Sequence, residues 1–342
     1  MDLTTRTDMK FTFNKPVAAV VACGLAMISL GAVAGTASAD PVGTPTQRAL
    51  VGVGSDTTYN VLNGLSEVVT IGGVKQIASY DPIPSTSLIS PKAAANCQNL
   101  TRPNGSGAGR TALINSLTPG NAIEGCYDFG RSSSLTLTAV ATATGGLTYI
   151  PFGVDAFTYA VAKDSAIPRD LSLNDVKSIF RCEVPEYQPY IPQSGSGTRS
   201  YWLAQMGITE TQVLNTYTCI KDVKNGSIIQ EHDGRVLTKS NEIAPFSIAN
   251  YVAQGAGVQT DLRGIADLGN MDAKSSLNPT TTSTLKRDIY NVIPTSKLAV
   301  APWSTVFVGG SSLVCTNTDT ITKYGFGLNA SCGSTTNQTP LS

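Results

Sequence analysis

Three segments of this chain combine glycine with hydroxyl residues directly ahead of a stretch with helical spacing. They are Val53-Gly-Ser-Asp-Thr-Thr58, Asn104-Gly-Ser-Gly-Ala-Gly-Arg110 and Ser194-Gly-Ser-Gly-Thr198. Glycine lets a backbone turn tightly, hydroxyls cap the first turn of a helix, and the free N–H groups there carry the positive end of the helix dipole. Each segment alone also fits an ordinary N-capped turn. The recurrence of the pattern favours loops that hold a small anion.

Strand-like and helix-like segments alternate along the chain, which predicts an α/β sheet with ligands bound where strands end and glycine loops lead into helices. Apolar residues at helical spacing predict helices, and short apolar or β-branched runs predict strands. We predict helices over 57–67, 111–117, 173–180 and 209–217, strands over 50–53, 78–80, 147–161, 285–293 and 298–308, and a strand passing into a helix over 243–253.

Two long strands mark where the chain passes between domains. The run from Leu147 to Val161 is interrupted by Pro151 and Gly153, and a second such passage lies near Asn291. A strand broken in this way is a natural crossover between domains. We therefore predict lobe 1 over residues 40–152 and 292–342 and lobe 2 over residues 153–291. The Ser/Thr/Asn-rich tail from Gly333 is expected to be loose.

The length, composition and charge of the chain limit the classes of protein to which it can belong. The chain has 342 residues, is 41% hydrophobic, and carries 24 basic and 24 acidic side chains. It is long enough for one large or two ordinary domains and too apolar to be disordered. Because it has no run of like charges, we expect no nucleic-acid partner.

The N-terminus is typical of an exported protein. Three basic residues precede an apolar run over residues 17–34, and Ala37-Ser-Ala39 follows. This pattern predicts a secretory signal over residues 1–39, cleaved before Asp40, and a secreted, extracytoplasmic product. Acylation of Cys23 as a cell-surface lipoprotein is the alternative, but it would leave an apolar tether where a polar linker is expected. No other stretch is apolar enough to span a membrane.

Six cysteines remain after the predicted cleavage. An even number in an exported chain indicates disulfides, and no Cys-x-x-Cys or Cys/His cluster indicates a metal site. Six cysteines allow 15 pairings. We favour pairs of neighbours in sequence, since each pair brackets one loop-rich segment: Cys97 with Cys126, Cys182 with Cys219, and Cys315 with Cys332.

The order of the loops resembles the phosphate-binding proteins of ABC transporters, over roughly residues 50–310. The motifs are Gly54-Ser-Asp-Thr-Thr58, Asn104-Gly-Ser-Gly-Ala-Gly109, Asp128-Phe-Gly-Arg-Ser-Ser133, Ile150-Pro-Phe-Gly-Val-Asp-Ala-Phe157 and Ser194-Gly-Ser-Gly-Thr198. The resemblance implies two α/β lobes joined by two crossovers, closed on a phosphate held by hydroxyls, backbone N–H groups, an Arg and Asp residues. The ligand-binding residues that it implies here are Ser55, Asp56, Thr57, Ser106, Gly107, Asp128, Arg131, Ser132, Ser196, Gly197, Thr198 and Arg199.

This chain departs from the family's pattern in the charged residues of the third loop. The family usually places an Arg and an Asp just before the Gly-Ser-Gly-Thr run, where this chain has Pro192 and Ser194. We therefore expect Arg131 or Arg199 to supply the missing cation. Asp128 is expected to accept the phosphate proton, which would let the site reject fully ionised sulfate.

Other functions compete with phosphate capture. A serine hydrolase needs Gly-x-Ser-x-Gly, which neither Ser106 nor Ser196 provides, and the single histidine, His232, stands in what is expected to be a solvated turn. We expect no enzyme activity and no cofactor. The second alternative is a secreted binding or surface protein of the same fold whose ligand is another oxyanion, a sugar or a protein. We expect a monomer, with an ABC permease as a possible partner.

Overall fold

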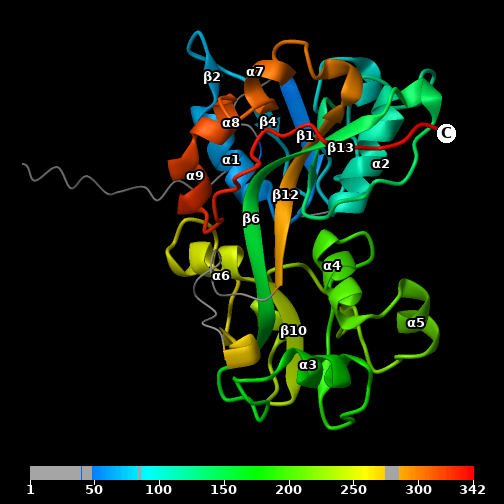
Figure 1. Cartoon of the computed structure of the whole chain (residues 1–342). Helices are drawn as coiled ribbons and strands as arrows, with labels where there is room; N and C mark the ends of the chain where they lie inside the picture. Colours follow the sequence, from blue (N-terminus) through cyan, green and yellow to red (C-terminus); the bar gives the residue numbers. More distant parts are fainter. Residues whose placement is uncertain (1–39, 41–47, 84–85, 274–284) are drawn as a thin grey trace, which may run out of the picture. The chain divides into compact units, whose positions relative to one another are not determined.

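The structure is a computed structural model, and it describes residue 40 and residues 48–83, 86–273 and 285–342 (Figure 1). The predicted signal segment, residues 1–39, and Cys23 lie outside the described residues, so export and acylation stay predictions. Among the described helices, none combines the length and the apolar character that crossing a bilayer requires.

Nine strands in the described part of the chain form one mixed sheet, whose path runs β4-β1-β5-β12-β6-β10-β7. β1 is parallel to both of its neighbours, β4 and β5, whereas β12 runs antiparallel to β5 and β6. The strands are β1 (Leu50–Gly54), β4 (Ile77–Ser79), β5 (Phe129–Ser132), β6 (Leu147–Ala162), β7 (Gln188–Pro189), β10 (Glu242–Ser247) and β12 (Leu285–Pro294), with β11 (Ala266–Leu268) and β13 (Asn337–Gln338) paired to β6. Two separate hairpins consist of β2 (Thr70–Ile71) with β3 (Val74–Lys75) and β8 (Val223–Lys224) with β9 (Ser227–Ile228).

The long strands β6 and β12 pair side by side along almost their whole length (Figure 1). Their register shifts between Ile289 and Tyr290, which face Gly153 and Pro151. Proline lacks a backbone N–H, so a bulge is a position in a sheet that tolerates it. The predicted interruption of the strand is therefore a bulge within one continuous strand.

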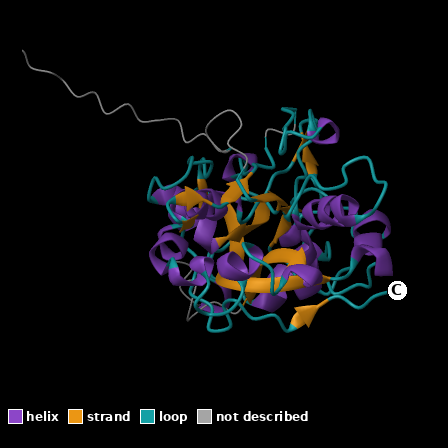
Figure 2. Cartoon of the chain, turned by 90° about the horizontal axis from the view of Figure 1, so that it is seen from above, coloured by secondary structure: helices purple, strands orange, loops and turns teal. Residues whose placement is uncertain are grey.

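Helices lie around the strands (Figure 2). They are α1 (Tyr59–Val68), α2 (Ser106–Leu117), α3 (Leu173–Phe180), α4 (Gly197–Met206), α5 (Glu210–Asn215), α6 (Ile248–Gly255), α7 (Trp303–Phe307), α8 (Leu313–Thr316) and α9 (Thr318–Lys323). Single 3₁₀ turns occur at Ala95–Cys97, Thr142–Thr144, Gly234–Val236, Met271–Ala273 and Thr295–Lys297. The predicted α3 is confirmed with the same bounds; Ser172 and Asp175 form a capping box at its start.

Two sequence predictions about helices are corrected. α2 begins at Ser106, inside the glycine loop, and not at residue 111. The predicted strand over 298–308 is wrong, because its second half is helix α7. Trp303, Val306 and Phe307 recur at helical spacing and pack in one apolar core, and a short apolar run does not by itself distinguish a strand from a helix.

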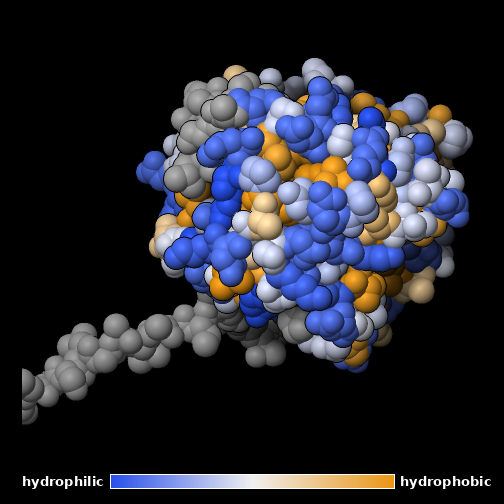
Figure 3. Space-filling model, turned by 90° about the horizontal axis from the view of Figure 1, so that it is seen from below, coloured by the Kyte–Doolittle hydropathy of each residue, from blue (hydrophilic) through white to orange (hydrophobic). Residues whose placement is uncertain are grey.

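Two apolar cores flank the middle of the sheet. One joins α1, α7 and α9 to β1, β5 and the end of β12, around Leu62, Phe129 and Ile293. The other joins α3, α4 and α5 to β6 and β10, around Phe180 and Trp202. On the face shown in Figure 3, hydrophobic areas lie among predominantly hydrophilic residues, as is normal for a folded surface.

The C-terminal tail is paired and not loose, which corrects the prediction for the tail. β13 pairs with β6, and the Leu147 N–H donates to the hydroxyl of Thr339 at 2.9 Å. The tail therefore completes the sheet at the start of β6.

The three predicted disulfides are all confirmed. They link Cys97 to Cys126, Cys182 to Cys219, and Cys315 to Cys332. Disulfides persist in oxidising compartments, so these three fit an extracytoplasmic location.

Candidate functional site

Six buried hydroxyls from four loops meet at one place, and we call them the hydroxyl cluster. They follow β1, precede or begin α2, follow β5, and precede or begin α4, and each side chain is at most 2% exposed. The members of the hydroxyl cluster are Ser55, Thr57, Ser106, Ser133, Ser196 and Thr198.

Ser133 contacts three other members of the hydroxyl cluster. Its Oγ lies 3.1 Å from the hydroxyl oxygens of Ser55 and Thr57 and 3.2 Å from that of Ser106. Thr57 Oγ1 in turn lies 3.3 Å from Thr198 Oγ1, which belongs to the first turn of α4. The three predicted loops therefore converge, as the sequence suggested, and a fourth loop supplies Ser133.

Two glycines make this convergence possible. A Cβ at Gly197 would lie 2.4 Å from the hydroxyl oxygens of both Ser106 and Ser133. Gly105 has φ +110°, and a Cβ there would lie 2.4 Å from the carbonyl oxygen of Gly195. A side chain at Gly197 would displace two hydroxyls of the hydroxyl cluster, and one at Gly105 would collide with the backbone of the third loop, so both positions require glycine.

The carboxylate of Glu231 occupies the donors of the hydroxyl cluster. Its oxygens accept hydrogen bonds from Ser196 Oγ, from Thr57 Oγ1 at 2.6 Å and from Thr198 Oγ1 at 2.9 Å. Burial alone would raise the pKa of this carboxyl, but His232 and Arg287 outweigh burial and lower the pKa to about 2. Glu231 is therefore an ionised internal acceptor in the hydroxyl cluster.

Arg287, on β12, is the cation of the hydroxyl cluster. Its Nη2 donates to Thr57 Oγ1 and Thr198 Oγ1, both at 2.9 Å, and lies 3.3 Å from Asp155 Oδ2. Its guanidinium carbon lies 4.1 Å from the centre of the Phe157 ring. Within the described residues, Nε and Nη1 have no hydrogen-bond partner although the side chain is buried. Arg287 therefore has donors to spare for a ligand.

Neither predicted arginine takes this position. Arg131 is fully buried behind the first loop, where it donates to the carbonyl oxygens of Gly52 at 3.2 Å and Gly54 at 3.1 Å and to Ser79 Oγ at 3.0 Å. Burial lowers the pKa of Arg131 to about 10. The expectation that Arg131 would serve the anion is corrected, since its donors are used by the backbone that it supports.

Arg199 is also held away from the hydroxyl cluster. Its guanidinium pairs with Glu210 and Asp222, each at 2.7 Å, and donates to the carbonyl oxygen of Pro192 at 3.1 Å. Although Arg199 lies in the first turn of α4, its side chain points to α5 and the segment after it. The prediction for Arg199 is corrected for the same reason as that for Arg131.

Other predicted residues lie beside the hydroxyl cluster and not in it. Asp128 accepts from Lys92 Nζ at 2.8 Å and from the Val51 N–H at 3.0 Å, so it anchors a loop and strand β1. Ser132 Oγ donates to the carbonyl oxygen of Ser134 at 2.6 Å. The Gly107 N–H donates to the Gly195 carbonyl at 3.1 Å, which joins the second and third loops.

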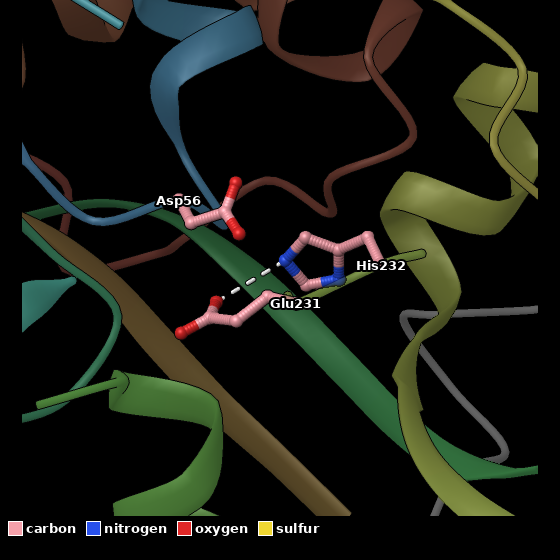
Figure 4. A group of neighbouring side chains, drawn as sticks. All are labelled: Asp56, Glu231 and His232. Carbon is pink, nitrogen blue, oxygen red and sulfur yellow. Dashed lines mark ion pairs between the residues drawn. The ribbon is translucent and has the colours of Figure 1, made fainter. Parts of the chain in front are cut away.

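His232 is buried, which corrects the prediction of a solvated turn. It stands with Glu231 and Asp56 in a group in which one carboxylate oxygen of each acid and one imidazole nitrogen lie within 4.8 Å of one another (Figure 4). Burial, and then the charge of Glu231, raise the pKa of Asp56 well above its ordinary value. The three residues border a pocket of about 260 Å³ that Asn250, Gln254 and Gln259 also line.

A larger pocket, of about 740 Å³, opens on the other side of Arg287. Tyr201 and Tyr290 contribute rings to its wall, and Ser134, Lys286 and Asp288 contribute polar groups. Arg287 thus lies between this pocket and the hydroxyl cluster.

Sequence reasoning missed Arg287, Asp155, Ser133 and Glu231. One signal was present: Lys286-Arg-Asp288 places three charges inside an otherwise apolar strand, and a charge in a buried strand needs a partner. Glu231 carried no such signal, because it stands in a polar segment that is typical of a turn.

No family model matches this chain, and no curated protein matches it. Among solved structures, a phosphate ABC transporter substrate-binding protein from Clostridium perfringens, with bound phosphate, matches 82% of this chain and 99% of its own, at 14% identity and TM-score 0.52. A phosphate-binding protein from Stenotrophomonas maltophilia matches 83% and 91%, at 13% identity and TM-score 0.48. Corynebacterium glutamicum OxyR with bound H₂O₂ matches 81% and 67%, at 11% identity and TM-score 0.46.

Identity this low establishes a fold and not a ligand. The strand order, the two long paired strands β6 and β12, and the match to the Clostridium structure all indicate the same fold. The chain has the two-lobed α/β fold, with two crossovers between lobes, that the substrate-binding proteins of phosphate ABC transporters have.

Proposed function

We propose that this chain is an extracytoplasmic solute-binding protein that captures a small oxyanion, with phosphate as the first candidate, at the hydroxyl cluster. The observation that carries the proposal is the convergence of six buried hydroxyls, three of which donate to the Glu231 carboxylate, with the Arg287 guanidinium, which donates to two of them. Donors already arranged around one oxyanion suit another of similar size. The Clostridium structure, which holds phosphate in the same fold, supports this choice.

Glu231 then acts as an internal competitor of the ligand. Hydroxyls of Thr57, Ser196 and Thr198 donate to its carboxylate, and each is a donor that a phosphate oxygen would use. Because Glu231 is ionised, an entering anion must displace it or tolerate its charge. Because three of the donors are already occupied, we expect a bound anion to displace the Glu231 side chain from the first turn of α4.

The proposed partners follow from the same reasoning. A protein of this fold that binds a solute outside the cytoplasm would hand the solute to an ABC permease, and we propose that it does so as a monomer. We retain 40–152 with 292–342, and 153–291, as the proposed lobes, with Arg287 and Asp155 in the second.

Calorimetric titration with phosphate, sulfate and molybdate tests the proposal. Thr198→Val removes one donor without changing side-chain shape, and we expect it to weaken phosphate binding about ten- to a hundredfold, since a hydrogen bond to a charged group is worth about 1.5–3 kcal/mol. Thr144→Val is the matched control, because the Thr144 hydroxyl is also buried but has no hydrogen-bond partner among the described residues. Wild-type protein that binds none of the three anions would refute the proposal.

Glu231→Gln tests the competition. The amide keeps the size of the side chain and removes its charge, so we expect tighter binding of both phosphate and sulfate than in the wild type. Weaker phosphate binding with stronger sulfate binding would instead assign Glu231 the role of accepting the phosphate proton.

A second candidate is a larger anionic solute, such as a sugar that carries an acidic group. The pocket of about 740 Å³ favours it, because this volume is in the range of sites for drug-sized ligands and Arg287 lines it. Tyr290→Ala would then weaken binding of the larger solute and leave phosphate binding unchanged.

A further inference from the structure

Asp56, Glu231 and His232 are three buried side chains that are not members of the hydroxyl cluster, and they are arranged like ligands of one metal ion. Asp56 follows β1, whereas Glu231 and His232 are adjacent residues between β9 and β10, and Figure 4 shows the side chains of Asp56 and Glu231 directed toward the imidazole. Asp56 is 2%, Glu231 3% and His232 5% exposed. Two carboxylates and one imidazole are therefore held together away from bulk water.

Polar atoms of Asp56 and His232 in this group lack hydrogen-bond partners. In the described part of the chain, Asp56 Oδ2 and both imidazole nitrogens of His232 make no hydrogen bond. His232 Nε2 does lie 3.2 Å from Glu231 Oε2, but the two atoms are not aligned for one. Buried polar atoms in native proteins are nearly always paired, so Asp56 Oδ2 and His232 Nδ1, which have neither a hydrogen bond nor an ion pair among the described residues, call for a missing partner.

The separations suit one ion. Zinc binds imidazole nitrogen at about 2.0–2.1 Å and carboxylate oxygen at about 2.0–2.2 Å, so neighbouring ligand atoms around it lie about 3–3.5 Å apart. The separation of 3.2 Å between His232 and Glu231 falls in this range. All three ligand atoms lie within 4.8 Å of one another, so one ion is within reach of the three side chains.

The backbone at His232 has a strained conformation. Its φ is +57°, which side-chain-bearing residues rarely adopt, and the Gln254 amide donates to its carbonyl oxygen at 2.9 Å. Strained backbone of this kind is concentrated at functional sites.

Glu231 can serve the ion and the hydroxyls together. A carboxylate offers about four lone-pair positions; Oε2, the oxygen that faces His232, accepts from the hydroxyls of Thr57 and Thr198, and Oε1 accepts from Ser196 Oγ and, at 3.5 Å, from the Thr198 N–H. Such hydroxyls orient a metal-binding carboxylate in the way that outer partners of metal ligands do. An ion at Oε2 would take the place of one of its two hydroxyl donors, while the other hydroxyl keeps the carboxylate oriented.

We propose that Asp56, Glu231 and His232 bind one first-row divalent cation, Zn²⁺ or Mn²⁺, with its open positions toward the pocket of about 260 Å³. A mixed set of imidazole and carboxylate ligands suits these ions, and three protein ligands leave room for water or solute. This site goes beyond the proposed function and does not depend on it.

The chain makes the test unusually direct, because His232 is its single histidine. Tag-free protein is treated with EDTA, dialysed and titrated calorimetrically with Zn²⁺ and, separately, with Mn²⁺. We expect one site per chain, and we expect His232→Gln and Asp56→Asn each to weaken binding of the ion at least tenfold. Zn²⁺ should also shift the imidazole ¹⁵N resonances in NMR spectra, which contain one histidine only.

Asp81→Asn is the control, because Asp81 is a buried carboxylate near Asp56 but outside the group of three. It should bind the ion as the wild type does. The proposal is overturned if wild type binds neither ion, if His232→Gln binds as tightly as wild type, or if saturating Zn²⁺ leaves the imidazole resonances in place. Anion titrations are run separately on metal-free protein, so failure of this proposal is distinguishable from failure of the oxyanion proposal.

Discussion

Replacing Arg287 with methionine tests which cation serves the hydroxyl cluster. Methionine keeps an unbranched apolar stem against the Phe157 ring, which lies 4.1 Å from the guanidinium carbon, and removes the charge and every donor. Two effects should follow, one on anion binding and one on folding, because Arg287 contacts both the hydroxyl cluster and Asp155.

The expected loss of affinity follows from the contacts of the guanidinium. Nη2 lies 2.9 Å from two hydroxyls of the hydroxyl cluster, and Nε and Nη1 have no partner among the described residues. A charge-assisted hydrogen bond to an anion is worth about 1.5–3 kcal/mol, so losing one should weaken phosphate binding about ten- to a hundredfold.

The expected loss of stability follows from the buried partner. Asp155 is fully buried, and its Oδ2 lies 3.3 Å from Arg287 Nη2. Removing one member of a buried ion pair costs about 3–5 kcal/mol, because the other charge is left unpaired. The double variant Arg287→Met/Asp155→Asn should recover much of this stability but none of the binding.

Calorimetric titration with phosphate measures the loss of affinity, and urea unfolding measures the loss of stability. Arg131→Met and Arg199→Met are the controls, because both arginines are buried but contact the backbone or other carboxylates. They should unfold at lower urea concentration than wild type and still bind phosphate where they are folded. The reasoning is refuted if Arg287→Met binds phosphate as tightly as wild type while either control loses binding.

Two further predictions concern stability. Burial raises the pKa of Asp81 to about 6, whereas it is about 4 when the chain is unfolded. The folded protein therefore binds this proton more readily than the unfolded chain does. The free energy of unfolding should fall as pH rises from about 4 to about 6, by an amount on the order of 3 kcal/mol. Asp81→Asn should flatten this difference in urea titrations; an unchanged pH profile would contradict it. Removing the 182–219 disulfide, which spans 37 residues, should cost about 4 kcal/mol, and removing the 315–332 disulfide, which spans 17, about 3 kcal/mol. Equal urea midpoints for the two serine variants would contradict the dependence on loop length.

Much of the fold could be predicted because its causes are local. The helical spacing of apolar residues and the Ser172 cap define α3 within a few residues of sequence, and each disulfide joins cysteines that are neighbours along the chain. The loops at Ser55, Ser106 and Ser196 were also recognisable, because glycine and hydroxyl residues ahead of a helix act on the adjacent backbone. Their order along the chain carried the resemblance that predicted the two-lobed fold.

The identity of the charged groups in the site was decided by the tertiary structure. Arg131 and Arg199 stand in the predicted motifs, but packing turns their side chains to carbonyl oxygens and to Glu210 and Asp222. Arg287 reaches the hydroxyl cluster from a strand far along the chain. Which face of a strand or helix meets the site depends on how distant elements pair, and no local pattern contains that information.

The group of Asp56, Glu231 and His232 shows the same limit. Glu-His-Asp-Gly is a polar sequence that is typical of an exposed turn, and only the fold brings it against the loop after β1 and buries it. By itself, the sequence determined where the loops, caps and disulfides are. The tertiary structure decided which carboxylates, which arginine and which imidazole meet there, because burial and charge pairing are set by residues that are distant along the chain and adjacent in space.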